Sequence, residues 1–382
     1  GLEHYCLAVG DLGPRKNLTA LGAAVRALRG NGLELALVGK PGNGRYARTL
    51  VAAMAATAGA DDEVTSLVAT PEGTRILEAF GPVRGVPGAD VARLARAAPR
   101  ALADIGAEAA VFTYVAPGWN PCPVLLAVHD ATFMTNPEWL GARARAVLRG
   151  LVPRAARRAA RVLALSETAA RDVAAALKLD PGKIRVVSPH PDPVFGPAEG
   201  AAERVRARFG LERYVLAVGD LGPRKNLTAL GAAVGGLGDP DLAFALVGKP
   251  GRGGERIAGE SGGRWLGHVS DADLADLYRA AAVTAYPSLY EGFGLPVVEA
   301  MACGSPVVAS DRGAIPEVAG DAAVLVDPSA RGIALGLRAA LDPDVAARLR
   351  AAGPARAATY TAERMGRAAW AAVREATEVR AA

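Results

Sequence analysis

The sequence predicts an α/β protein with two domains, each built on a parallel sheet that helices cover on both faces. Its 382 residues exceed one ordinary domain, and 51% apolar with 22% charged residues is a composition that supplies two hydrophobic cores. Short apolar segments alternate with helical segments along the chain, as in proteins with parallel sheets. The proline-rich segment at 189–197, PHPDPVFGP, separates two such runs and is the best candidate for a linker. We therefore expect two Rossmann-like domains.

Six apolar segments define the expected sheet of the first domain, residues 33–195. Each is short, rich in Val, Leu, Ala and Ile, and followed by a helical segment or a turn. In chain order they are LELALVG (33–39), EVTSLVA (63–69), AAVFTY (109–114), PVLLAVHD (123–130), RVLALS (161–166) and KIRVVS (183–188).

The second domain, residues 196–360, repeats this rhythm. Its expected strands are YVLAVGD (214–220), FALVG (244–248), RWLGHV (264–269), VTAYPS (283–288), PVVAS (306–310) and AAVLVD (322–327). The last segment, 361–382, is expected to be a helix from about Ala362 to Val379 with Met365, Trp370 and Val373 on one apolar stripe.

The N-terminus carries an internal repeat. Residues 1–42 align without gaps to 210–251, and LAVGDLGPRKNLTALGAAV at 7–25 is identical to 216–234. A single second copy is no solenoid period, so it indicates duplication of one unit or a chimeric gene assembly. Residues 1–32 are expected to form an extra N-terminal βα segment in front of the first domain.

Composition narrows the class of partner. The net charge of +5 favours acidic partners such as nucleotides, phospholipid head groups or phosphate-linked acceptors. No nucleic acid is expected, because there is no aromatic-interleaved basic strand or basic heptad region.

No apolar run approaches the roughly eighteen residues of a membrane span and no leader segment is evident, so a soluble, cytoplasmic protein is expected. The cysteines are few and far apart, which indicates neither disulfides nor a metal site.

Two glutamates flank a glycine loop that opens a helix at 287–310, PSLYEGFGLPVVEAMACGSPVVAS. Glu291 precedes the loop, and Glu299 is expected inside the first helical turn. Pro296 suits the first helical position and Gly304 the residue just past the helix end. The backbone N–H groups of such a loop bind phosphate, and a carboxylate beside them accepts hydrogen bonds from hydroxyls. The residues of the loop are Gly292, Phe293, Gly294 and Leu295.

The run E-G-F-G-L-P-V-V-E resembles the Glu-x7-Glu motif of retaining GT-B glycosyltransferases, in particular family 4 (glycosyl transferases group 1). The resemblance covers about residues 33–378. It implies a GT-B fold of two domains facing a cleft, with the nucleotide sugar mainly on the second domain and the final helix crossing back to the first. In the family the second glutamate, here Glu299, binds the ribose, the first, here Glu291, faces the donor sugar, and the segment around Leu266 flanks the base.

A basic turn, GDLGPRKN at 219–226, follows a strand and opens a helix, which makes a second phosphate site. Arg224 and Lys225 would add positive charge where a diphosphate leaving group gains negative charge. Many family members carry an arginine directly after the first glycine, where this chain has Asp220, and a lysine that Lys225 matches. The G-x-x-x-P-R-K-N variant resembles mannosyltransferase members.

The first copy of this turn, with Arg15 and Lys16, is expected to be catalytically silent, because no Glu-x7-Glu loop follows it in the same domain.

Two features of the first domain also resemble the family. His129 ends a strand at the carboxyl edge, where open α/β sheets bind ligands, and looks like the histidine that faces the donor sugar. Gly42 and Gly44 form a glycine turn expected against the donor phosphates and sugar. The same glycines fit a dinucleotide pattern, but no acidic residue ends the second strand at Ala69 and Thr70, which argues against a nicotinamide cofactor.

Two further segments carry patterns found at functional sites. Asp271 and Asp273 have the D-x-D form of metal-dependent GT-A enzymes, but they follow Ser270 at a helix start, so capping is expected and no metal. The segment 143–161 holds seven arginines and no acid. It is either a basic amphipathic face for anionic lipid or a lipid-diphosphate acceptor, or a solvated helix face broken at Pro153.

The resemblance implies a hexosyltransferase of polysaccharide biosynthesis, retaining and metal-independent, with a nucleotide sugar as co-substrate and no cofactor. Mannose from GDP-mannose is the favoured donor, and the acceptor is a hydroxyl of a glycan or a lipid-linked sugar, with peripheral contact at the inner membrane face. Two alternatives stay open: a GT-B-fold sugar-nucleotide 2-epimerase, and a non-catalytic nucleotide-sugar-binding module.

Overall fold

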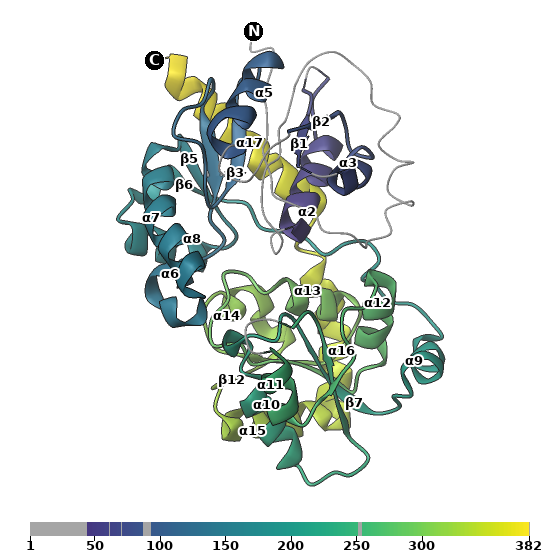
Figure 1. The fold of residues 1–382 in the computed structure, drawn as a ribbon. Helices are drawn as coiled ribbons and strands as arrows, with labels where there is room; N and C mark the ends of the chain where they lie inside the picture. Colours follow the sequence, from purple (N-terminus) through teal and green to yellow (C-terminus); the bar gives the residue numbers. More distant parts are fainter. Residues whose placement is uncertain (1–43, 61, 70, 87–92, 251–253, 382) are drawn as a thin grey trace. The chain divides into compact units, whose positions relative to one another are not determined.

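The computed structural model describes residues 44–60, 62–69, 71–86, 93–250 and 254–381. The chain divides into two compact units, one made of residues 1–135, 142–189 and 361–382 and the other of residues 136–141 and 190–360 (Figure 1). The expected strand at 33–39, the repeat at 1–32 with Arg15 and Lys16, and Gly42 lie outside the described residues. No helix in the described ranges has the length and apolarity needed to cross a membrane.

The first unit holds a parallel sheet in the order β3-β4-β5-β6 and a separate parallel pair, β1-β2. The strands are β1 (Ser66–Val68), β2 (Val83–Gly85), β3 (Ala110–Thr113), β4 (Val124–Ala127), β5 (Arg161–Ala164) and β6 (Ile184–Val186). The helices are α2 (Gly44–Ala56), α3 (Pro71–Leu77), α5 (Ala98–Asp104), α6 (Thr132–Thr135), α7 (Ala142–Arg158), α8 (Glu167–Leu177) and α17 (Ala362–Ala381), with single turns at Arg93–Ala97 and Pro181–Lys183. Every strand expected in the described part is confirmed, and β2 was not expected, because its residues, VRG, form no apolar run.

The C-terminal helix α17 packs against α2 within this unit (Figure 1). The predicted stripe is confirmed, since Met365, Trp370 and Val373 are all buried. The Trp370 indole donates a hydrogen bond to the Met54 carbonyl at 3.0 Å. A Cβ at Gly366 would lie 2.1 Å from Thr57 Oγ1, so the two helices approach too closely there for any other residue.

Helix α7 corrects one expectation. It runs unbroken through Pro153, although a proline removes one backbone hydrogen bond of a helix. Val152 and Ala156, on either side of the proline, are fully buried against the unit, and this packing stabilises the helix across that position.

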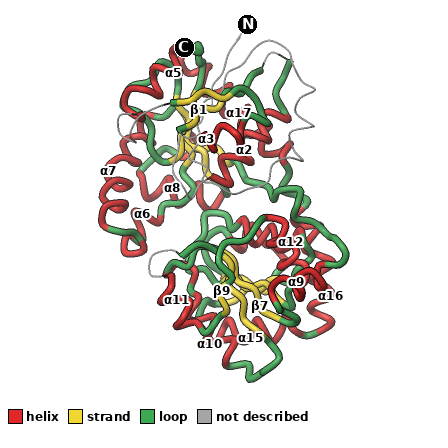
Figure 2. The backbone as a smooth tube through the Cα atoms, turned by 45° about the vertical axis from the view of Figure 1, so that its right-hand side comes forward, coloured by secondary structure: helices red, strands yellow, loops and turns green. Residues whose placement is uncertain are grey.

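The second unit holds one parallel sheet in the order β12-β11-β10-β7-β8-β9, with helices on both faces (Figure 2). Its strands are β7 (Tyr214–Val218), β8 (Ala243–Val247), β9 (Arg264–Trp265), β10 (Val283–Tyr286), β11 (Val307–Ser310) and β12 (Val324–Val326). Its helices are α9 (Ala201–Phe209), α10 (Leu227–Gly235), α11 (Gly254–Ser261), α12 (Asp271–Ala280), α13 (Leu295–Ala302), α14 (Ile315–Ala319), α15 (Ala330–Leu341) and α16 (Pro343–Ala357), with single turns at Pro137–Trp139, Pro223–Lys225 and Gly320–Ala322. All six expected strands are confirmed.

The strand order has one reversal, between β7 and β10. From β7 the chain adds β8 and β9 on one side, then returns to the other side of β7 to add β10, β11 and β12. In open parallel sheets the crevice for ligands lies at the carboxyl ends of the two strands where the order reverses. Every residue of β10 and β11 is buried, so close packing on both faces fixes the position of this edge.

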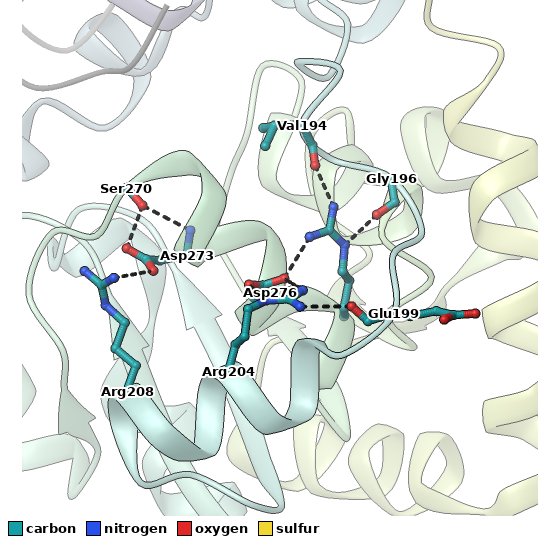
Figure 3. A network of polar contacts seen from close by, with 9 residues as sticks. Val194, Gly196, Glu199, Arg204, Arg208, Ser270, Asp273 and Asp276 are labelled. Carbon is teal, nitrogen blue, oxygen red and sulfur yellow. Dashed lines mark hydrogen bonds and ion pairs between the residues drawn. The ribbon is translucent and has the colours of Figure 1, made fainter. Parts of the chain in front are cut away.

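Arg279 of α12 binds the segment that enters the second unit, whose residues Val194 and Gly196 are labelled in Figure 3. Its guanidinium donates to the carbonyls of Val194 at 2.7 Å and Gly196 at 2.6 Å, and pairs with Asp276 at 2.9 Å. Residues 190–196 therefore pack with the second unit, which begins at residue 190. The sequence pattern suggested a boundary after residue 195.

Candidate functional site

The two segments that the sequence singled out in the second unit meet at the reversal of the strand order. The turn Gly219–Lys225 follows β7, and Pro287–Glu291 follows β10, the strand paired with β7. Residues 66 positions apart in the sequence, Lys225 and Glu291, are thereby brought into contact.

These side chains form a cluster of charges in which Lys225 and Glu291 are buried and Arg224 is one quarter exposed. Lys225 Nζ lies 2.7 Å from Glu291 Oε1 and donates a second hydrogen bond to Tyr286 Oη at 2.5 Å. Arg224 pairs with the same Glu291 oxygen at 2.5 Å. Lys225 is only 6% exposed and Glu291 8%. The sequence did not single out Tyr286, whose hydroxyl signals a role only once the strand pairing is known.

Two cations share one carboxylate in this cluster. Burial on its own would raise the pKa of Glu291, but the charges of Arg224 and Lys225 outweigh it and lower that pKa to about 2. Burial lowers the pKa of Lys225, with Glu291 opposing this and Arg224 adding to it. Asp220, 3.9 Å from Arg224, is more than half exposed and therefore screened by water. The cluster as a whole thus carries excess positive charge, contributed by the partly exposed Arg224, which an incoming anion would compensate.

Glycines allow the two loops to close around the cluster. Gly219 has φ +149°, and a Cβ there would lie 2.7 Å from Lys225 Cε. Gly313 has φ +57°, and a Cβ there would lie 2.5 Å from the Glu291 carbonyl, which accepts a hydrogen bond from the Ala314 N–H at 2.9 Å. A side chain at either position would push the lysine or the glutamate out of place. The sequence pattern missed Gly313.

Asn226 ties the basic turn to the neighbouring loops. Its backbone is left-handed, with φ +57°, and its amide donates to the carbonyls of Pro287 at 3.2 Å and Pro328 at 2.7 Å. The Leu289 N–H donates to the Arg224 carbonyl at 2.8 Å. The loops after β10 and β12 therefore hold the basic turn in place.

The glycine loop leads into α13 as expected, with a shift of one residue. The helix begins at Leu295, so Pro296 is its second residue, and Gly294, with φ +95°, precedes it without any side-chain cap. Phe293 is buried, with its ring edge-on to Tyr360 at 5.2 Å between centroids. An uncapped helix N-terminus beside a cationic cluster favours a phosphate.

Glu299 lies deeper than its predicted role suggested. Because α13 starts at Leu295, Glu299 is in the second turn, and its exposed fraction is 0%. It accepts a hydrogen bond from the Tyr278 hydroxyl at 3.4 Å. Contact with a ribose would therefore require this side chain to become accessible.

Leu266 lies at the same carboxyl edge of the sheet, beyond β9. Its N–H donates to the Leu246 carbonyl at 2.8 Å, and the Trp265 indole donates to the Gly248 carbonyl at 3.0 Å. Gly248 has φ +151°, and a Cβ there would lie 1.6 Å from the Gly219 carbonyl, so the loops after β7 and β8 pack backbone to backbone.

His129 belongs to the first unit, two residues beyond the end of β4. Its ring packs against Tyr46, with centroids 4.6 Å apart, and Tyr114, at 5.3 Å. Burial lowers the pKa of His129 to about 3, so the imidazole is neutral. Gly44 is the first residue of α2, the helix that carries Tyr46. The sequence did not single out either tyrosine.

Ser270 caps α12, and the D-x-D segment occupies its first turn, where acidic residues suit a helix start (Figure 3). Ser270 Oγ accepts from the Asp273 N–H at 3.1 Å and donates to the Asp273 carboxylate at 2.6 Å. Arg208 pairs with the same carboxylate at 3.1 Å. The described part of the chain contains no group of three His, Cys, Asp or Glu residues arranged to hold a metal ion.

Most of the second unit is similar to known glycosyltransferases. Residues 202–356 match the family model of glycosyl transferases group 1. The O-antigen chain mannosyltransferase B of Escherichia coli is 40% identical over 143 residues, which are 35% of this chain and 38% of that protein. The MMP alpha-(1->4)-mannosyltransferase of Mycolicibacterium hassiacum is 38% identical over 187 residues, 46% of this chain and 44% of that protein. The chain thus spans less than half of the length of these relatives.

Solved structures match over nearly the whole chain. A sucrose-phosphate synthase from Thermosynechococcus elongatus has a TM-score of 0.68 at 21% identity, covering 94% of each chain. Anabaena HepE in complex with UDP-glucose has a TM-score of 0.68 at 16% identity, covering 100% of each chain. The GT-B fold predicted from the sequence is confirmed, and residues 202–356 match the glycosyl transferases group 1 family model.

Proposed function

We propose that the chain is a retaining, metal-independent hexosyltransferase that uses a nucleotide-sugar donor and a hydroxyl acceptor on a glycan or a lipid-linked sugar. The observation that carries the proposal is the cluster of Arg224 with the buried pair Lys225 and Glu291, at the strand-order reversal of a domain that matches glycosyl transferases group 1. Its excess positive charge suits the diphosphate of the donor.

In the proposed reaction the bond between the sugar C1 and the diphosphate oxygen breaks, and the acceptor oxygen bonds to C1 from the same face. The acceptor's proton passes to the departing phosphate. Arg224 and Lys225 stabilise the charge that develops on the diphosphate, which is the contribution a metal ion makes in other enzymes. Glu291 orients the sugar.

The nucleotide is proposed to lie along the carboxyl edge of the second sheet. Within the second unit Glu299 holds the ribose once its side chain becomes accessible, the segment at Leu266 flanks the base, and the amides of 292–295 contact the phosphate. GDP-mannose is the favoured donor, because both relatives above are named mannosyltransferases and the G-x-x-x-P-R-K-N turn resembles that group.

A donor screen tests the proposal. Purified protein is incubated with GDP-mannose, UDP-glucose and other nucleotide sugars, with methyl glycosides as acceptors, with and without EDTA. We expect one donor to yield an α-linked product in EDTA. Release of an epimerised sugar without acceptor use would indicate an epimerase, and binding without turnover a non-catalytic module.

Helix α7 supports peripheral contact of the protein with an anionic membrane. Val147 is 40% exposed and Leu151 45%, on the face opposite the buried Val152 and Ala156. The residues that share the exposed face at helical spacing are Arg143, Val147, Leu151, Arg154 and Arg158. Arginines beside exposed aliphatic groups suit anionic head groups above an acyl layer.

Vesicle sedimentation tests this contact. We expect binding to phosphatidylglycerol vesicles and not to phosphatidylcholine, weakened by the pair Val147→Ser with Leu151→Ser. Leu335→Ser is the control, because Leu335 on α15 is an even more exposed leucine, at 56%. Equal losses from the two variants would contradict a role for this face.

A further inference from the structure

The side chain of Tyr286 is part of the charged cluster but carries no charge itself. Tyr286 is the last residue of β10 and is 3% exposed. Its hydroxyl oxygen accepts a hydrogen bond from Lys225 Nζ at 2.5 Å, and Nζ lies 4.3 Å from the centroid of the same ring. Two parts of one aromatic side chain therefore contact the buried ammonium.

The ring of Tyr286 also reaches the glycine loop. A Cβ at Gly294, the residue before α13, would lie 3.8 Å from Tyr286 Cε1, so the ring packs close to the backbone of that loop. Lys225 comes from the basic turn after β7, the strand paired with β10. Tyr286 thus lies between the two segments that the proposed function assigns to the donor diphosphate.

The hydrogen bonds of Lys225 give the hydroxyl a distinct part. An ammonium has three N–H donors, and among the described residues Lys225 has two acceptors, Glu291 Oε1 and Tyr286 Oη. Arg224 contacts the same Glu291 oxygen at 2.5 Å, so two cations share that acceptor. The Tyr286 hydroxyl is the acceptor that Lys225 does not share with Arg224. The third N–H is available to an oxygen of a bound phosphate.

A phenol can hold an ammonium without neutralising it. Burial raises the pKa of Tyr286 well above its usual range, and the charge of Glu291 raises it further, so the phenol is protonated at neutral pH. A second carboxylate in this position would cancel the positive charge that attracts a diphosphate. A neutral oxygen adds a hydrogen bond to the charged group and leaves that charge in place.

We propose that Tyr286 is a positioning residue for the donor diphosphate, because its hydroxyl keeps the ammonium of Lys225 in place and charged while a phosphate binds. The inference rests on the proposed function and deepens it, and it involves the second unit alone. The groups that face Lys225 are Tyr286 on β10, Glu291 in the loop beyond β10, and Arg224 and Asp220 in the basic turn.

The variant Tyr286→Phe removes the oxygen and keeps the ring. Binding of inorganic pyrophosphate is measured by calorimetry in EDTA, across neutral and alkaline pH. Loss of a hydrogen bond to a buried ammonium lowers the pKa of Lys225 further, so affinity should begin to fall about one pH unit lower in the variant. Beyond that point the variant should bind about tenfold more weakly than the wild type. Titration of pyrophosphate itself is the same for both proteins and cancels in the comparison.

Tyr214→Phe is the matched control. Tyr214 is a fully buried tyrosine at the start of β7, the end of the strand away from the basic turn, and its hydroxyl donates to the Leu277 carbonyl at 2.7 Å. Its loss should lower the thermal midpoint by a few degrees and leave the pH profile of binding unchanged.

A double variant tests whether Tyr286 acts through the lysine. Lys225→Met with Tyr286→Phe should bind pyrophosphate no more weakly than Lys225→Met alone, because the hydroxyl then has no ammonium to hold. An additive loss would contradict the proposal, as would a Tyr286→Phe profile that coincides with the wild-type profile. Failure of the wild-type protein to bind pyrophosphate would overturn the diphosphate site, and the inference with it. A wild type that binds pyrophosphate but transfers no sugar would overturn the proposed catalysis alone, and a shifted profile would still support the role of Tyr286.

Discussion

Replacing Lys225 with methionine should separate the catalytic from the structural value of the buried charge cluster. Methionine fills nearly the same space but cannot donate to Glu291 Oε1 or to Tyr286 Oη, which Lys225 Nζ reaches at 2.7 and 2.5 Å. If the lysine stabilises a departing diphosphate, its loss removes one preorganised cation from the transition state.

The expected losses of turnover and of folding stability differ in size. Loss of one such stabiliser lowers turnover by about two to three orders of magnitude, or ~3–4 kcal/mol of activation free energy. Removing one partner of a buried ion pair costs about 3–5 kcal/mol of stability when the other charge is left alone. Here Arg224 still pairs with Glu291 at 2.5 Å, and the lowered pKa of Lys225 shows that burial disfavours its charge. The stability loss should therefore be ~1–2 kcal/mol.

Transfer kinetics and chemical denaturation are measured on the same preparation, in EDTA. Lys178→Met is the control, because Lys178 is an exposed lysine of the first unit. The reasoning is refuted if Lys225→Met keeps turnover within a few-fold of the wild-type value, or if wild-type turnover requires added Mg²⁺ or Mn²⁺.

Other consequences of the site can be measured. Glu299→Ala should weaken binding of the free nucleoside diphosphate more than Glu291→Ala does in calorimetry, because only Glu299 is assigned to the ribose; equal losses would contradict the assignment. Diphosphate binding should raise the lowered pKa of Lys225, so above that pKa in the free protein binding takes up a proton and weakens by up to about tenfold per pH unit. Affinity that does not change with pH in that range would argue against the contact. Arg15→Ala with Lys16→Ala should leave donor affinity and turnover unchanged, whereas the same double substitution in the second copy of the motif should abolish turnover; equal effects would reveal a second working site.

Local sequence signals were sufficient for the elements and for much of the site. Short apolar runs predicted the parallel strands, because both faces of such strands are buried. The glycines and flanking glutamates at 291–299 predicted a loop opening a helix, and Ser270 before Asp273 predicted a cap, because both depend on neighbouring residues alone. The family resemblance of the second domain rested on the same local patterns.

Long-range packing decided the rest. Strand pairing placed Tyr286 against Lys225, and the start of α13 buried Glu299, neither of which follows from spacing along the chain. Burial of Val152 and Ala156 stabilised α7 across Pro153. The contact between Tyr46 and His129 joins a helix and a strand end far apart in sequence. In each case the outcome depends on which surfaces the folded chain removes from water, and a residue's neighbours in sequence do not determine its neighbours in space.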